Sequence, residues 1–208
     1  MSEPASAPAA STASAFAVFG LEPRPLLDQD ALKEQFARAT AENHPDRFAH
    51  LPEAEKVVAE ARYTAINRAF QTLRDSKERL LHLFELDTGA KPRDIMRIPP
   101  GTMDLFVEIG QACQAADTYF KDKAEAFGAL AKAKLAKTGI ELLQKLQALA
   151  NKVNEWEKGL DAEMAALDAR WIAGDHQSAA LETLYRKFSY SARWKQQLDE
   201  RIVTLFAD

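Results

Sequence analysis

The tripeptide His44-Pro45-Asp46 is the part of this 208-residue sequence with the clearest capacity for chemistry. An imidazole and a carboxylate two residues apart suggest an acid–base pair, but the sequence supplies no nucleophile motif or glycine-rich phosphate loop to go with them. The proline fixes its own φ angle and lacks an N–H, so it stiffens the loop and presents both side chains to a partner. On the tripeptide alone two interpretations stay open. It is either a binding loop, or a helix–helix connector in which proline breaks one helix and aspartate caps the next.

The remaining candidate side chains indicate no metal site, cofactor or catalytic centre. His50, His82 and His176 are scattered and lack metal-ligand spacing. Cys113 is the only cysteine, which excludes an intramolecular disulfide and a thiolate zinc cluster. It falls in an apolar stripe, so we expect a buried and unreactive thiol. The sequence therefore predicts a protein that is not an enzyme.

The composition is that of a soluble globular protein, with 28% charged and 47% hydrophobic residues. The net charge of −4 disfavours nucleic-acid binding, which needs a basic surface. No stretch approaches the ~18 apolar residues of a membrane span, so we expect no membrane partner. The single cysteine allows no intramolecular disulfide framework, which favours a reducing, cytoplasmic location. Met1 to Ala15 is rich in Ala, Ser, Pro and Thr and lacks the basic start and apolar middle of a secretory signal, which predicts a disordered tail.

The elements that position the tripeptide are predicted to be helices, because strand patterns are absent. Asp28 is placed to cap a helix that runs to about Asn43 and must stop before Pro45. A second helix begins near Pro52, and its predicted apolar face comprises Val58, Ala61, Ala65, Ala69 and Leu73, with Phe70 beside it. The sequence thus predicts an antiparallel helical hairpin with the tripeptide in its loop.

The second half of the chain is predicted to form a separate helical bundle, which makes the whole protein all-α. Asp75 and Glu78 resemble a capping box for a short helix that completes the first half. Residues 87–101 hold two glycines and three prolines and are predicted to be a linker. Three long helices follow and favour an antiparallel bundle, over 102–137, 140–172 and 177–206. The two turns are expected at Thr138-Gly139 and Gly174-Asp175.

The hairpin and its loop resemble the J-domain, whose invariant His-Pro-Asp occupies the same loop. Two further segments agree: Phe19-Gly20-Leu21 before the first helix, and the run Ile66 to Leu73 near the end of the second. The resemblance implies that basic residues around the loop meet an acidic chaperone surface. The expected chaperone-binding residues are therefore Lys33, Arg38, His44, Pro45, Asp46 and Arg47.

Among J-proteins the sequence is most similar to the HscB type, the co-chaperones of iron–sulfur cluster assembly. It lacks the glycine/phenylalanine-rich segment and zinc-binding cysteines of most J-proteins, and its loop His44 to Ala49 matches the HscB version. Arg186 to Tyr190 is similar to the last HscB helix. The resemblance implies a J-domain over 16–86, a linker over 87–101 and a three-helix client-binding bundle over 102–208.

An HscB-type protein is expected to stimulate the ATPase of a DnaK/HscA-class chaperone and to deliver the iron–sulfur scaffold IscU, with no cofactor of its own. The family grips IscU with a Leu/Met cluster followed by glutamates on the first bundle helix, whereas residues 103–111 here hold fewer acids. Helical spacing puts Met103 and Val107 off the apolar stripe of their helix, and Tyr190 off the stripe of the last helix. Phe106 heads the first stripe, and the expected client-binding residues are Met103, Phe106, Val107 and Tyr190.

Three alternatives stay open. Exposed apolar residues are common, so the client-binding surface could be ordinary surface scatter. A diverged bundle would suit a J-protein that serves another client. A helical scaffold whose loop engages no chaperone would show the same hairpin without the activity.

Overall fold

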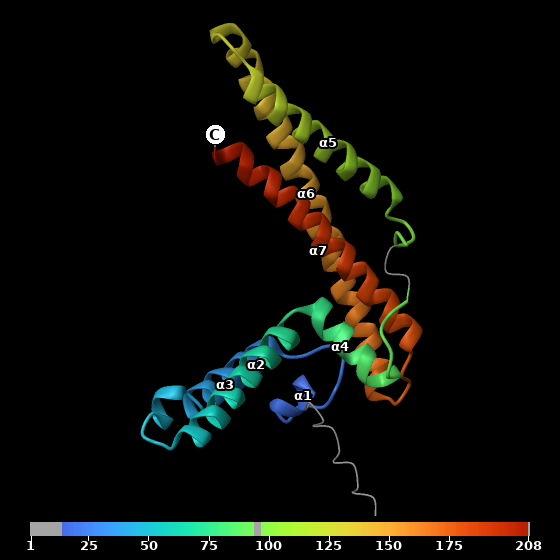
Figure 1. The fold of residues 1–208 in the computed structure, drawn as a ribbon. Coiled ribbons are helices and arrows are strands. Elements are labelled where there is room, and N and C mark those ends of the chain that lie inside the picture. Colours follow the sequence, from blue (N-terminus) through green and yellow to red (C-terminus); the bar gives the residue numbers. More distant parts are fainter. Residues whose placement is uncertain (1–13, 94–96, 208) are drawn as a thin grey trace, which may run out of the picture. The chain divides into compact units, whose positions relative to one another are not determined.

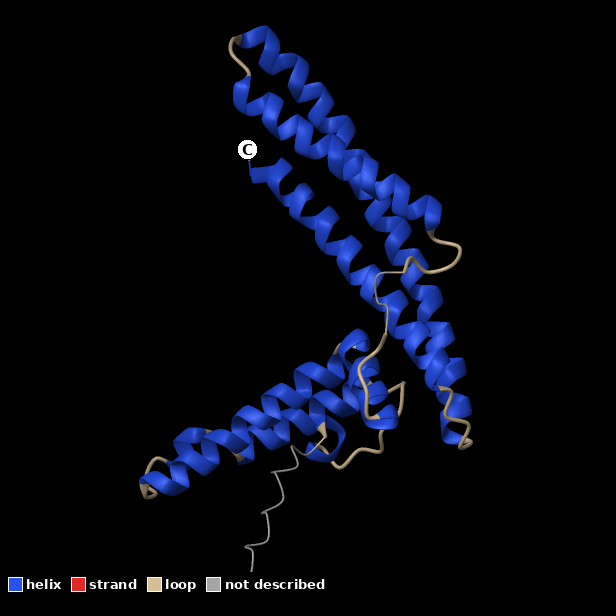
Figure 2. Ribbon diagram, turned by 45° about the vertical axis from the view of Figure 1, so that its right-hand side comes forward, coloured by secondary structure: helices blue, strands red, loops and turns tan. Residues whose placement is uncertain are grey.

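The structure, a computed structural model, describes residues 14–93 and 97–207. Every regular element in these two ranges is helical, which confirms the predicted all-α class (Figures 1 and 2). The chain divides into two compact units, residues 1–91 and 92–208. The elements of the first unit are α1 (Ala15–Val18), α2 (Gln29–Glu42), the 3₁₀ turn η1 (Pro45–Phe48), α3 (Glu53–Arg74) and α4 (Ser76–Thr88).

Two aspartates begin helices of the first unit, as the sequence predicted. The Asp28 side chain accepts hydrogen bonds from the N–H groups of Asp30 and Ala31 at 2.9 and 3.0 Å, which starts α2. The Asp75 side chain accepts from the Glu78 N–H at 2.9 Å and starts α4. Both caps satisfy backbone donors that have no partner within their own helix.

Helices α2 and α3 pack as a hairpin around an aromatic pair. The rings of Phe36 and Phe70 are stacked with centroids 4.0 Å apart and an interplanar angle of 11°. The predicted apolar face of α3 was wrong in part, because Val58, Ala61 and Ala65 are exposed. The buried side chains of α3 are Ala59, Ile66, Ala69, Phe70 and Leu73. The large side chains Ile66 and Phe70 determine which side of α3 is buried. The prediction instead assigned the buried side from the regular spacing of alanines along the helix.

A buried arginine holds the corner between α3 and α4. Arg79 is only 2% exposed. Its guanidinium donates to the carbonyl oxygens of Pro25 and Leu73 at 2.7 and 2.5 Å and to the Ser76 hydroxyl at 3.2 Å. A buried cation needs such partners, and here they join three segments of the unit. No sequence pattern around Arg79 indicates this role.

The predicted disordered tail lies mostly outside the described residues, which begin at Ser14. Its last residue, Ala15, is instead the first residue of α1 and is buried. The Ala15 N–H donates to Nε2 of His82 at 3.0 Å, and the ring of Phe16 stacks on His82 with centroids 5.8 Å apart. His82 therefore ties the start of α1 to α4.

The second unit is a bundle of three long helices: α5 (Met103–Glu125), α6 (Ala129–Ile172) and α7 (Ser178–Ala207). The expected turn at Thr138-Gly139 was wrong, because both residues lie inside α6. The chain reverses earlier, around Gly128, whose φ of 92° is in the left-handed region that favours glycine. Gly139 serves close packing instead, since a Cβ built on it would come within 2.5 Å of the Tyr119 hydroxyl oxygen on α5.

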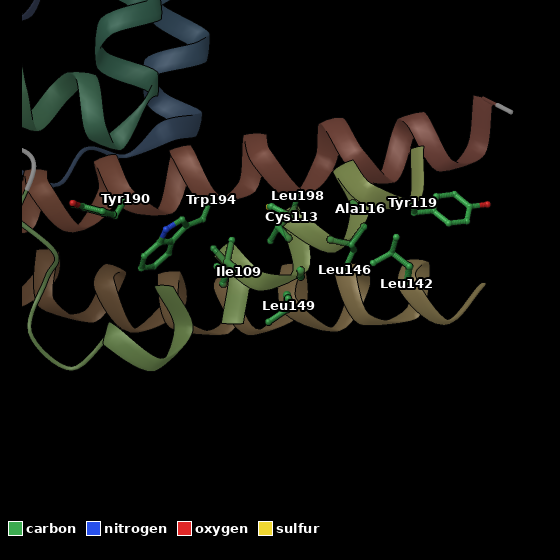
Figure 3. Packing of buried hydrophobic residues seen from close by; sticks show 12 residues of the cluster. Ile109, Cys113, Ala116, Tyr119, Leu142, Leu146, Leu149, Tyr190, Trp194 and Leu198 are labelled. Atoms are coloured by element: carbon green, nitrogen blue, oxygen red, sulfur yellow. The ribbon is translucent and has the colours of Figure 1, made fainter. Parts of the chain in front are cut away.

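The core of the second unit runs along the contact between all three helices (Figure 3). Cys113 lies in it, as predicted, and burial raises the pKa of its thiol. Ion pairs bracket the core: Arg201 on α7 meets Asp117 on α5 at 3.0 Å, and Lys152 on α6 meets Glu108 on α5 at 2.6 Å. The buried cluster comprises Ile109, Ala112, Cys113, Ala116, Tyr119, Leu142, Leu146, Leu149, Val153, Tyr190, Trp194 and Leu198.

We expect Gly139→Ala and Gly159→Ala to differ in stability, although both glycines lie within α6. A Cβ at Gly159 meets nothing within 4 Å, so this substitution should raise the free energy of unfolding by about 0.5–1 kcal/mol through helix propensity. At Gly139 the Tyr119 ring must move, which should cancel or reverse the gain. Thermal and chemical denaturation of the two variants measure the difference. Equal stabilisation by the two substitutions would show that the Tyr119 side chain tolerates a methyl group at position 139.

We expect His82 to titrate below the ordinary histidine value, because burial lowers its pKa while Glu85 opposes the shift. Protonation of Nε2 would remove the acceptor of the Ala15 N–H. The unfolded chain takes up the proton more readily, so the stability that this contact supplies is present above about pH 6.5 and is lost as the pH falls through the folded-state pKa. An NMR titration should show the low midpoint in the imidazole and in the Ala15 amide together.

The control for this titration is His82→Gln, which keeps an acceptor but does not titrate. Its Ala15 amide signal should stay constant over the same pH range. A His82 midpoint above about 6.5 in the parent protein would contradict the buried acceptor.

Candidate functional site

The tripeptide sits at the start of η1, in the loop between α2 and α3 (Figure 1). His44 is extended, with φ −64° and ψ 133°, and Pro45 is the first residue of the turn. Nδ1 of His44 accepts the Asp46 N–H at 3.3 Å, and the His44 carbonyl accepts the Arg47 N–H at 3.0 Å. The loop is therefore a defined turn that the His44 side chain itself caps.

The two polar side chains of the tripeptide are open to solvent but held differently. The His44 ring meets the Tyr63 ring of α3 edge-on, with centroids 5.7 Å apart, and remains half exposed. The Asp46 carboxylate is 90% exposed and lies 3.5 Å from Nδ1 of His44. A neutral imidazole has one donor and one acceptor nitrogen, so an accepting Nδ1 leaves Nε2 as the donor. The loop thus offers a partner a hydrogen-bond donor and an acidic acceptor side by side.

A small hollow of about 240 Å³ adjoins the tripeptide on the side of α3. It lies between the turn η1 and the first turns of α3, with Val57 and Val58 exposed on the same helix. Such a hollow beside a rigid loop is a shape that a partner's side chain could enter. Its lining residues are Pro45, Asp46, Phe48, Ala49, Lys56, Ala59 and Glu60.

The predicted basic residues are exposed but do not form one cluster. Arg47 lies in η1, next to the tripeptide, whereas Lys33 and Arg38 are on α2. Arg38 follows Lys33 by five positions in the α-helix, which puts the two side chains about 140° apart around the helix axis. Lys33 also pairs with Asp30 at 2.9 Å, and this hydrogen bond lowers the pKa of the Asp30 carboxyl. The structure therefore brings Arg47 to the loop and leaves Lys33 and Arg38 on different sides of α2.

Three of the four expected client-binding residues share one exposed surface. Met103, Phe106 and Val107 are 55%, 41% and 44% exposed in the first turns of α5. Their spacing of three and four residues places them on one face of the helix. Apolar side chains gathered in this way are a suitable contact for another protein. We call these three residues the α5 patch.

Tyr190, the fourth residue, was wrongly expected to face solvent. It is buried in the core of the second unit, where its ring lies 5.5 Å from that of Trp194 (Figure 3). The Arg193 guanidinium lies 5.5 Å from the centroid of the same ring. Helix α7 packs against both α5 and α6, so its buried arc is wider than the single stripe that the prediction allowed. Tyr190 is therefore a packing residue.

Two features of the site were missed by the sequence analysis. The Tyr63 ring, which orients His44, lies on the opposite helix, and only the packing of the hairpin brings the two together. The exposed pair Val57 and Val58 was obscured because Val58 was assigned to the buried face. Among the described residues, no three His, Cys, Asp or Glu side chains are placed to hold a metal ion. The helices of that same part of the chain include none that is long and apolar enough to cross a membrane.

Comparison with known proteins gives relatives in both sequence and structure, although no family model matches the chain. The chain is 27% identical over 190 residues to a co-chaperone protein HscB homolog of Aromatoleum aromaticum, and the match covers 91% of this chain and 94% of that protein. An HscB homolog of Paraburkholderia xenovorans is 41% identical over 86 residues, which are 40% of this chain and 49% of that protein.

Two solved structures share the fold. Chaperone HscB from Vibrio cholerae aligns with a TM-score of 0.61 at 23% identity, and the alignment covers 92% of this chain and 99% of that one. The human co-chaperone protein HscB aligns with a TM-score of 0.57 at 19% identity and covers 95% of this chain and 84% of that one. The similarity in fold therefore extends over both units.

Proposed function

We propose that this chain, which sequence and fold support as an HscB-type co-chaperone, stimulates the ATPase of a DnaK/HscA-class chaperone and brings it an IscU-like iron–sulfur scaffold. It would act in the cytoplasm as a binding protein rather than an enzyme. The observation that carries the proposal is the exposed and rigid loop His44-Pro45-Asp46.

The loop supports chaperone binding because its groups are oriented before the partner arrives. Pro45 fixes the backbone, Tyr63 contacts the His44 ring, and the Asp46 N–H binds Nδ1 of His44. Such preorganisation reduces the conformational entropy lost on association. Arg47 adds a cation directly beside the acceptor and donor, which favours an acidic partner surface. Lys33 and Arg38 would extend this attraction along two sides of α2, mainly by speeding encounter.

The α5 patch supports client binding in the second unit. Its three apolar side chains are exposed and do not form part of the core of the bundle, which is built from other residues. They are therefore available to contact another protein. The loop and the patch belong to different compact units, so each unit can bind its own partner. A client held on the patch would then reach the chaperone at a high effective concentration once the loop docks.

We expect His44→Gln to abolish stimulation of the chaperone ATPase while the protein stays folded. The side chain is half exposed, so its contribution to stability is small, but glutamine cannot reproduce the ring that contacts Tyr63. Single-turnover ATPase measurements with DnaK and with HscA, each with and without IscU, provide the test.

The matched control is His50→Gln, because His50 is also an exposed histidine of the same connection between α2 and α3. It should stimulate like the parent protein. Full stimulation by a folded His44→Gln protein would refute the role of the loop. Absence of stimulation by the parent protein would favour a helical scaffold without a chaperone partner.

We expect Met103→Ala combined with Val107→Ala to weaken IscU binding by about 1–3 kcal/mol, measured by titration calorimetry. Both side chains are exposed, so circular dichroism and thermal stability should not change. Ile172→Ala combined with Val203→Ala is the control, since these exposed residues belong to the same unit and lie outside the α5 patch. Equal affinities for both double variants would show that the client binds elsewhere. No IscU binding by the parent protein would favour a different client.

A further inference from the structure

We propose that the turn between α5 and α6, together with the first three turns of α6, docks on an anionic lipid surface. We call residues 126–140 the α5–α6 tip. The inference is independent of the chaperone-binding loop and of the α5 patch, which lie elsewhere in the chain.

The α5–α6 tip exposes large apolar side chains that nothing in its own unit covers. Phe127 is 96% exposed and Leu130 is 86% exposed, the highest values among the large hydrophobic residues described, and Ile140 is 60% exposed. Phe127 lies between the end of α5 and the start of α6, beside the left-handed Gly128. The tip forms one end of the second unit, beyond the C-terminal end of α7 (Figures 1 and 2).

The first turns of α6 have a second apolar face, which points away from the bundle. Leu135, Gly139 and Leu142 pack inward or toward α5. Leu130, Ala133, Lys137 and Ile140 follow at spacings of three and four residues and are all exposed. Lys137 lies within this outer face and Lys134 lies at its edge, whereas Lys132 is close in angle to Gly139, which faces α5. A helix face that combines large apolar side chains with lysines is typical of helices that lie in a membrane interface.

The charge of the α5–α6 tip is positive throughout. Residues 126–140 hold three lysines and no acidic residue, in a chain whose net charge is −4. Lys137 lies 3.8 Å from Glu141, just beyond the tip, and Lys134 lines a hollow shared with Asp122 and Glu125 of α5. With these neighbours included, residues 121–141 hold five lysines and three acidic residues, a net charge of +2. Because charges are screened over about 8 Å at physiological salt, a nearby surface responds mainly to this local positive charge.

An anionic membrane fits these observations better than a protein partner does. Phe127, Leu130 and Ile140 do not line the hollow between α5 and α6, so they project outward. Side chains that project in this way can insert into a flat, deformable surface such as a membrane interface. A second copy of the tip would bring three lysines against three lysines. Lysines near an anionic lipid surface are each attracted to it, and their long stems let apolar neighbours enter the interface.

This proposal qualifies the expectation that the protein has no membrane partner. That expectation followed from the lack of an apolar stretch long enough to span a bilayer. A peripheral contact needs only a few inserted side chains and a basic border. The docking proposed here is therefore reversible and sensitive to salt.

The test is co-sedimentation of the full chain with vesicles of phosphatidylcholine alone and of phosphatidylcholine and phosphatidylglycerol in equal parts. We expect binding to the anionic vesicles only, weakening as salt is added. Phe127→Ser combined with Leu130→Ser should lower the partition coefficient at least about tenfold. Lys132→Glu combined with Lys134→Glu should lower it by at least a similar factor. Because all four side chains are exposed, the fold should not change.

The control is Ile172→Ser combined with Val203→Ser, two exposed apolar residues of the same unit that should leave binding unchanged. The proposal is overturned if the parent protein ignores anionic vesicles, binds both vesicle types equally, or loses binding as much in the control as in the tip variants. Sedimentation velocity tests the alternative, which is that the tip binds a second copy of the protein. A dimer that disappears with Phe127→Ser and Leu130→Ser, without vesicle binding, would assign the tip to self-association.

Discussion

The stacked rings of Phe36 and Phe70 fix the hairpin on which the rest of the first unit depends. They hold α2 against α3, and the chain between the two helices closes through the short turn η1. The same packing brings the Tyr63 ring edge-on to the His44 ring. Arg79 secures the other end of α3 by joining it to α4 and to the segment before α2. The orientation of the tripeptide is therefore a property of the whole hairpin.

The local chemistry of the fold could be predicted from sequence, because it depends on near neighbours along the chain. Asp28 and Asp75 start helices since a short acidic side chain reaches its own helix's first N–H groups, whatever packs around it. The loop was located correctly because proline excludes a helix through it. The basic residues around it were identified by type, but their separation around α2 follows from helix geometry and places them on two sides.

The packing could not be predicted in the same way, because it depends on which helices meet. Tyr190 was misplaced because it was judged against a single stripe, while α7 contacts both α5 and α6. Val58 was misplaced because the predicted face of α3 followed a row of alanines and left out Ile66. Gly139 was interpreted as a turn because glycine often breaks helices, whereas here its missing side chain admits Tyr119. Of the candidate client-binding residues, Met103, Phe106 and Val107 remain on the surface, because they lie outside the face of α5 that packs in the core of the second unit.

The burial of Cys113 has a consequence for the cargo proposed here. Its thiol lies in the core of the second unit, and burial raises its pKa, so the thiolate that binds iron or attacks a disulfide is scarce. It is the only cysteine in the chain. A protein that carries a scaffold for sulfide-bridged iron would thus offer no competing thiolate to the metal and no reactive thiol to oxidants. Such a carrier would not draw iron from a labile cluster through a thiol of its own.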